Sequence, residues 1–125
     1  GGEVPKAPMK DRLDPLLLAR KFLAYGEQLD RFDDAHIVGW QRLGDLEHAD
    51  SGLVTVISNT DDGALHFSFG ESHAKTVWVD ITRHRVEEII LSDYGEADFP
   101  VSGGKVSVWV KKVAVEKIPG GLPRE

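Results

Sequence analysis

Hydrophobic residues follow two different periods along this chain, and the change between them divides it. Between residues 11 and 26 the apolar positions recur with helical spacing. Asp11 before this stretch and Gly26 after it are residue types that commonly begin and end a helix. From about residue 36 onward, short apolar runs alternate with polar residues in steps of two, which is typical of β-strands. The pattern therefore predicts one α-helix followed by an all-β region.

The all-β region is predicted to contain about seven strands separated by clusters of Gly, Asp and Ser. We expect the strands near 36–42, 52–59, 64–70, 75–81, 86–91, 96–101 and 105–116. This spacing predicts a mainly β fold, an antiparallel Greek-key β-sandwich of about seven or eight strands preceded by one N-terminal α-helix. The predicted division is an extended lead-in (1–10), the helix (11–26), the sandwich (32–116) and a tail (117–125).

The predicted helix is more apolar than a surface helix needs. Its leucine, phenylalanine, alanine and tyrosine residues cover far more than the roughly 100° stripe that faces a single core. We therefore expect it to be buried on two sides, by the β region and by another body. That body would be an adjoining domain or, for the chain by itself, a second copy in a two-fold dimer. The residues expected at this inter-domain or dimer surface are Leu16, Leu17, Phe22 and Leu23.

Composition narrows the classes of partner. The 125 residues suffice for one domain, and the net charge of −6 comes without the basic cluster that nucleic-acid binding requires. The apolar runs are too short to cross a bilayer. The chain has no cysteine, so disulfides and thiolate chemistry are excluded. We expect neither a nucleic-acid partner nor a membrane partner.

Tryptophan residues on the strands are the candidate ligand contacts. Alternation predicts Trp78 on the same polar face as Thr76, and Trp109 on the same polar face as Lys105. An indole on a polar face is covered by the chain's own loops, packs against another domain, or stacks on a sugar ring. Trp40 is expected in the core, because its strand does not alternate cleanly, and it is the third candidate for carbohydrate binding.

The sequence contains no recognisable catalytic motif. The acidic residues Asp30, Asp33 and Asp34 lack the spacing of a calcium loop, and Asp61-Asp62-Gly63 is explained by turn preference. The chain shows no phosphate-binding loop, nucleophile elbow or helical histidine pair. We therefore expect no catalytic residue here.

Five segments in order resemble a known protein family. The chain is similar to the junction between the last barrel helix and the C-terminal β domain of bacterial α-amylases, closest to the intracellular, cytoplasmic type. The resemblance runs from about Pro8 to Val110, and it is carried by residues 24–33, 37–40, 56–63, 76–80 and 103–110.

This resemblance implies a non-catalytic C-terminal domain. The parent enzyme would be a retaining glycoside hydrolase that cleaves internal α-1,4-glucosidic bonds of starch-like glucans, and its catalytic carboxylates would lie upstream, on the (β/α) barrel. The domain would stabilise that barrel, with contact to polysaccharide as an additional role. Two alternatives are a self-sufficient carbohydrate-binding module that stacks glucose on tryptophan and a small β domain that binds another protein.

The resemblance also implies expectations about calcium binding and about the cellular location. Secreted members of the family hold calcium between barrel and C-terminal domain, but the corresponding positions here are Ala35, His36 and Asn59. Ala35 cannot bind a metal, so His36 and Asn59 are weak candidates. We expect no cofactor in this chain, while calcium remains an option for the parent enzyme. The expected location is the cytoplasm, with secretion as the alternative.

Overall fold

The computed structural model describes residues 26–34, 36–45, 47–48 and 50–115. The lead-in, nearly all of the predicted helix 11–26 and the tail 117–125 lie outside the described residues. The surface expected at Leu16, Leu17, Phe22 and Leu23 lies outside them too.

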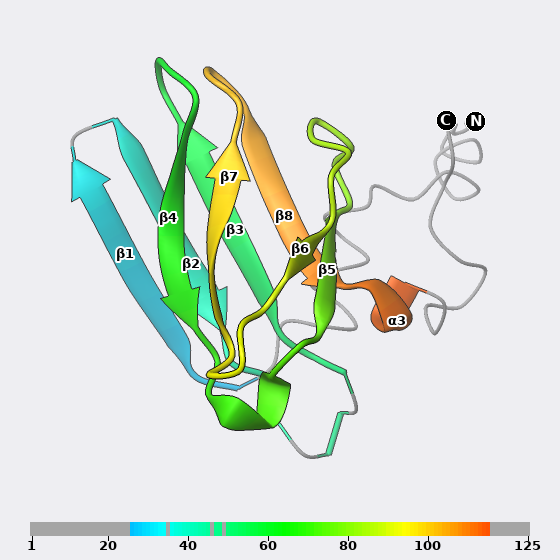
Figure 1. The fold of residues 1–125 in the computed structure, drawn as a ribbon. Helices are drawn as coiled ribbons and strands as arrows, with labels where there is room; N and C mark the ends of the chain where they lie inside the picture. Colours follow the sequence, from blue (N-terminus) through cyan, green and yellow to red (C-terminus); the bar gives the residue numbers. More distant parts are fainter. Residues whose placement is uncertain (1–25, 35, 46, 49, 116–125) are drawn as a thin grey trace, which may run out of the picture.

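Eight strands in the described residues form two antiparallel sheets, as Figure 1 shows. The larger sheet has the order β1-β2-β3-β8-β5-β6, and the smaller sheet contains β4 and β7. β8 pairs with β3 on one side and β5 on the other, so the last strand returns to the middle of the sheet. The predicted antiparallel β-sandwich is confirmed. The bounds are β1 (Gln28–Asp34), β2 (Ile37–Arg42), β3 (Leu53–Ser58), β4 (Gly63–Ser68), β5 (Val77–Asp80), β6 (Ile89–Ile90), β7 (Glu96–Val101) and β8 (Val106–Lys111).

Three elements differ from their predicted form. β1 was not predicted, because its sequence is mostly charged and polar and has no alternating apolar signal; backbone pairing with β2 defines it instead. β6 has two residues rather than six. The strand predicted over 105–116 ends at Lys111, and α3 (Lys112–Val115) follows as one helical turn whose Ala114 is buried. A 3₁₀ turn, η1 (Glu71–His73), joins β4 to β5.

The main hydrophobic core lies between the two sheets. Aromatic rings fill its centre: Trp78, Phe67, Phe99 and Trp109 are 0% exposed, and the ring centroids of neighbouring pairs lie 5.7–6.2 Å apart. These T-shaped contacts are a favourable arrangement for aromatic rings. The full set of buried residues is Ile37, Val54, Val56, Leu65, Phe67, Phe69, Trp78, Leu91, Phe99, Val101 and Trp109.

The prediction that Trp78 and Trp109 stand on polar strand faces is wrong. Their side of the larger sheet faces β4 and β7 and is the core itself. Each indole N–H satisfies its hydrogen bond inside the fold, Trp78 with the Thr76 hydroxyl at 2.9 Å and Trp109 with the Pro100 carbonyl at 3.1 Å. A polar neighbour in the sequence therefore did not mean a solvated face.

The opposite face of the larger sheet is also apolar in its middle. A second cluster of buried residues gathers there around α3, on β3, β5 and β8. We call this side of the larger sheet, away from β4 and β7, the outer face. Its buried members are Leu53, Ile81, Val108, Val110 and Ala114, with Val79, Val106 and Val115 partly buried beside them. An antiparallel sheet in a sandwich commonly has one face in the core and one in water, so this second apolar face calls for an explanation.

Candidate functional site

Two of the three candidate sugar-stacking residues are closed off. Trp78 and Trp109 are 0% exposed, so neither offers a ring face to a ligand in this structure. Of the three interpretations given for these two indoles, the first fits their surroundings: other parts of the same chain cover them. Trp40 remains as the candidate.

Trp40 lies on β2 and is half-buried. Along this strand Ile37, Gly39 and Gln41 are buried, whereas Val38, Trp40 and Arg42 are partly exposed, so Trp40 belongs to the outer face. It therefore differs from the core position expected from the sequence. Directly across the ladder it pairs with Asp30 of β1 on one side and with Thr55 of β3 on the other.

Polar side chains surround Trp40 on the β1 side. The Arg42 Nη1 donates to the side-chain Oε1 of Gln28 at 3.4 Å, and the side-chain Nε2 of Gln28 donates to the Asp30 carboxylate at 3.3 Å. Both distances are longer than the usual value near 2.9 Å, which marks these as weak bonds. The Arg42 Nε is buried and has no hydrogen-bond partner in the part of the chain that the structure describes. We call Gln28, Asp30, Trp40 and Arg42 the Trp40 cluster.

His36 and Asn59 are brought together at the ends of β2 and β3. The Asn59 backbone N–H donates to the His36 carbonyl at 2.9 Å, and both residues are exposed. Within the described residues no group of three or more His, Cys, Asp or Glu is arranged to hold a metal ion.

Asp80, at the end of β5, is a buried carboxylate that sequence analysis did not single out. One oxygen accepts from the Thr82 N–H (2.9 Å), the Thr82 hydroxyl (2.7 Å) and the Val108 N–H (3.1 Å). The other accepts from the Arg85 N–H (3.0 Å) and the Ser107 hydroxyl (2.6 Å). The carboxylate thus fixes the loop after β5 onto β8. The Asp-x-Thr spacing at 80–82 was the one available hint of this turn.

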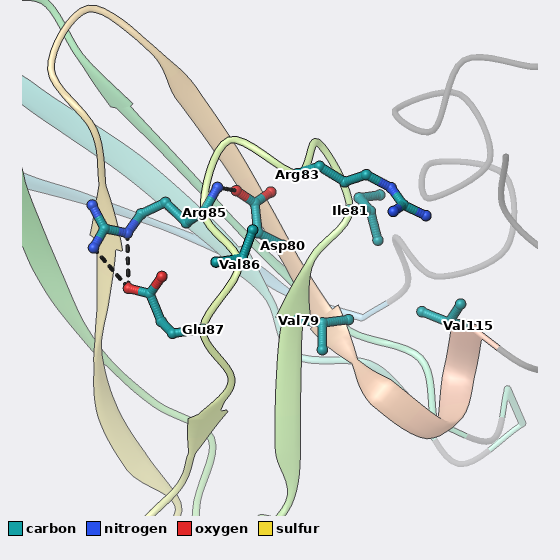
Figure 2. A pocket seen from close by; sticks show the side chains of 8 residues that line it. All are labelled: Val79, Asp80, Ile81, Arg83, Arg85, Val86, Glu87 and Val115. Carbon is teal, nitrogen blue, oxygen red and sulfur yellow. Dashed lines mark hydrogen bonds and ion pairs between the residues drawn. The ribbon is translucent and has the colours of Figure 1, made fainter. Parts of the chain in front are cut away.

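A hollow of about 260 Å³ lies beside this loop. Figure 2 shows Val79, Ile81 and Val115 on the α3 side, whereas the ion pair between Arg85 and Glu87, at 2.8 Å, lies on the other side of the loop. This ion pair raises the pKa of Arg85 and lowers that of Glu87. Asp80 and Arg83 also line the hollow, so its wall combines apolar side chains with charged groups.

His66 bridges two carboxylates on the outer surface of the smaller sheet. Its Nδ1 lies 2.8 Å from Asp98 and its Nε2 lies 3.1 Å from Glu96. Hydrogen bonds to Asp98 and then to Glu96 raise the pKa of His66 above its ordinary value. The two carboxylates contact opposite nitrogens of the ring, so they do not converge on one point as ligands of a metal would.

The class of protein follows from comparison with known sequences. No family model matches the chain. The chain is 41% identical over 110 residues to an α-amylase of Bacillus licheniformis, which covers 88% of this chain and 21% of that protein. It is 40% identical over 104 residues to a glucan 1,4-α-maltohexaosidase of Bacillus sp. strain 707, over 83% of this chain and 20% of that protein. The recognised resemblance to bacterial α-amylases is therefore confirmed.

The particular relatives include a cytoplasmic enzyme. The chain is 39% identical over 103 residues to the cytoplasmic α-amylase of Escherichia coli K12, over 82% of this chain and 20% of that protein. An α-amylase structure from Malbranchea cinnamomea shares the fold, with a TM-score of 0.54 and 14% identity over 74% of this chain and 18% of that one. The chain thus spans about a fifth of the length of the curated relatives it matches. The described residues contain no helix long and apolar enough to cross a membrane.

Proposed function

We propose that this chain is the non-catalytic C-terminal domain of an α-amylase and that it stabilises the catalytic barrel. The observation that carries the proposal is the second apolar face of a sandwich that matches about a fifth of complete α-amylases. The parent enzyme would hydrolyse internal α-1,4-glucosidic bonds of starch-like glucans, as a retaining glycoside hydrolase whose catalytic carboxylates lie on the barrel.

The outer face is suited to a large apolar partner. Leu53, Val108 and Val110 are each no more than 5% exposed although they point away from the main core. These three side chains are already covered within the chain, and the apolar surface still open to water beside them is at Val86, which is 90% exposed and lines the hollow with Val79 and Ile81. Covering such side chains stabilises an assembly by roughly 25 cal/mol per Å² of apolar area removed from water. An adjoining barrel would provide that cover.

The state of the carboxylates supports a role without catalysis. Asp80 is the buried carboxylate of the described chain, and its five hydrogen bonds all hold the fold together. A glycosidase needs two carboxyl groups flanking an accessible bond. Asp98 is exposed and Glu96 is partly exposed, but His66 bridges them. None of these groups has the environment of a general acid or nucleophile.

A chimeric enzyme tests the proposal. The matching fifth of the Bacillus licheniformis α-amylase is replaced by this chain, and starch hydrolysis is compared among the chimera, the truncated amylase and the isolated chain. We expect hydrolysis by the chimera, none by the isolated chain, and faster thermal inactivation of the truncated enzyme. Hydrolysis by the isolated chain at the chimera's rate would overturn the proposal.

Location and self-association follow from the same proposal. Similarity to the cytoplasmic α-amylase of Escherichia coli supports the cytoplasm as the site of the parent enzyme. Without a barrel, the outer face would favour association of two copies of the chain. Analytical ultracentrifugation at rising concentration would then show a dimer, and the chimera would sediment as a monomer. Monomeric sedimentation of the isolated chain at all concentrations would contradict the dimer.

A further inference from the structure

His73 lies at one end of the sandwich, in the turn η1 that crosses from β4 of the smaller sheet to β5 of the larger sheet (Figure 1). The Nδ1 atom of its imidazole is buried and has no hydrogen-bond partner in the part of the chain that the structure describes. The ring lies against Phe69, with the two centroids 5.5 Å apart, and the Phe69 ring lies 4.7 Å from that of Trp78. The imidazole therefore continues the aromatic core at this end of the fold.

Hydrogen bonds also connect the His73 backbone to Trp78. The His73 carbonyl accepts from the Thr76 hydroxyl at 2.7 Å, and the same hydroxyl accepts from the Trp78 indole N–H at 2.9 Å. The His73 N–H donates to the Gly70 carbonyl at 3.0 Å. A displacement of His73 would therefore disturb the Trp78 indole both through the ring contacts and through the backbone.

A positive charge acts on the His73 ring from the larger sheet. Lys111, the last residue of β8, is only 8% exposed, and its Cα pairs with that of Trp78 across the ladder. Burial of the ring and, second, the charge of Lys111 lower the pKa of His73 below its ordinary value of 6.5. A proton on His73 would therefore add a second positive charge to a site that is closed off from water.

Carboxylates around the turn lie at the surface or have other partners. They are Glu71, which is exposed, Asp93, which pairs with Lys75, and Glu96, which pairs with His66. None of these three raises the pKa of His73. Within the described residues they therefore do not offset the positive charge of Lys111 at the ring.

From this geometry we propose that His73 is an acid-sensitive latch: protonation of its ring displaces η1 from Lys111 and opens the end of the aromatic core at Phe69 and Trp78. In the protonated imidazole both nitrogens carry a hydrogen, so the buried Nδ1 becomes a donor without an acceptor among the described residues. An unpaired buried donor and two like charges in a buried site are both costly. Because η1 contains no fully buried residue, it can move into water, which relieves both costs. The inference goes beyond the proposed function and does not rest on it.

The direction of the pH dependence follows from the lowered pKa. The unfolded chain, in which the pKa of His73 is near 6.5, binds this proton more tightly than the folded chain does. The contribution of His73 to stability is therefore full above about pH 6.5 and is lost as the pH falls through the folded pKa. For one histidine, the opening equilibrium constant can rise at most about tenfold between pH 7 and pH 5.5. His66, whose pKa is raised, acts in the opposite direction.

Hydrogen exchange of the indole N–H groups, measured by NMR on the ¹⁵N-labelled chain, tests the latch. The chain carries His66→Gln, which removes the opposing titration. Trp109 is the internal reference, because its indole N–H is bonded to the Pro100 carbonyl and shares the intrinsic exchange chemistry of Trp78. We expect the protection of Trp78 relative to that of Trp109 to fall several-fold between about pH 7 and pH 5.5.

Two substitutions separate the latch from a purely structural role of His73. His73→Gln takes up no proton in this range, so the relative protection should stay constant with pH. Lys111→Met retains the apolar stem but removes the charge, so the fall should be smaller and should begin at a higher pH. Lys75→Met is the matched control, because it removes a lysine that is 68% exposed just after η1, and it should leave the pH response unchanged.

Four outcomes would overturn the inference. They are a relative protection of Trp78 that is constant with pH, the same pH response with and without His73, equal responses of Lys111→Met and Lys75→Met, and a ring pKa of His73 at or above 6.5. The ring pKa is measured by NMR on the folded chain with His73 in place, so that this outcome does not depend on the folding of any His73 variant. None of these outcomes affects starch hydrolysis by the chimera, so the proposed function is tested separately.

Discussion

Replacing the buried carboxylate of Asp80 by an amide should destabilise the fold severely for so small a change. Asp80→Asn preserves the size of the side chain but puts an N–H₂ group where one oxygen accepted hydrogen bonds. If the remaining oxygen stays with Thr82 and Val108, the new amide faces the Arg85 N–H, which then loses its acceptor. The Ser107 hydroxyl can rotate to accept, so that contact is retained in weaker form.

The magnitude follows from these contacts. A hydrogen bond to a charged group contributes about 1.5–3 kcal/mol, and an unpaired backbone N–H in a partly buried site costs about 1–3 kcal/mol. Because the other bonds survive in part, we expect the free energy of unfolding to fall by about 2–4 kcal/mol. For a domain of this size that corresponds to a decrease in Tm of roughly 10 °C.

Urea denaturation followed by tryptophan fluorescence is the assay. The midpoint should move to lower urea with an unchanged slope, because the surface exposed on unfolding is the same. Asp93→Asn is the control: Asp93 is 77% exposed and pairs with Lys75 on the surface, so its change should stay within about 0.5 kcal/mol. An Asp80→Asn midpoint that matches this control would refute the role assigned to the carboxylate.

Three further predictions concern other parts of the molecule. Hydrogen bonds to Asp98 and Glu96 raise the pKa of His66 in the folded state. Protonated His66 therefore stabilises the fold fully below its unfolded pKa near 6.5, and this stabilisation is lost as the pH rises through its folded pKa. This pH dependence should be small, about 0.5 kcal/mol or less at so exposed a site, and should vanish in His66→Gln; an NMR titration with a pKa at or below 6.5 would contradict it. Gly95→Ala should lower the free energy of unfolding by about 2–4 kcal/mol, since Gly95 has φ +78° and an added Cβ would overlap the Gly70 carbonyl; a neutral effect in urea denaturation would contradict it. Chelation of calcium by EGTA should leave the Tm of the isolated chain unchanged, because the resemblance to secreted α-amylases puts Ala35 at the position of a calcium ligand and alanine cannot bind a metal. A fall of several degrees would contradict this prediction.

The strands with regular alternation were predictable from the sequence. β3, β4 and β7 were predicted within about two residues of their bounds, because apolar side chains and turn clusters define them locally. β1 was missed because its mostly polar sequence has little local preference for a strand, and its place depends on hydrogen bonds to β2. Pairing between distant segments is not encoded in a local pattern.

The strand faces were harder to predict than the strands. Thr76 made the Trp78 face look solvated, but its hydroxyl accepts the Trp78 indole N–H inside the fold, and both faces of the larger sheet are apolar in its centre. The Trp40 cluster could not be predicted from the sequence for a related reason. Its Gln28 and Asp30 come from the strand that was not predicted, so the sequence showed the tryptophan without its polar neighbours.

The most direct test of the account is the thermal inactivation of the Bacillus licheniformis chimera with one outer-face residue changed. Val115 on α3 is partly buried beside the outer-face cluster, and Tyr94 is 64% exposed in the loop before β7. Because an aspartate at a covered apolar contact is costly, we expect Val115→Asp to shorten the half-life of starch-hydrolysing activity several-fold, while Tyr94→Asp leaves it unchanged. Equal half-lives for the two variants would contradict the claim that this domain stabilises a catalytic barrel through its outer face.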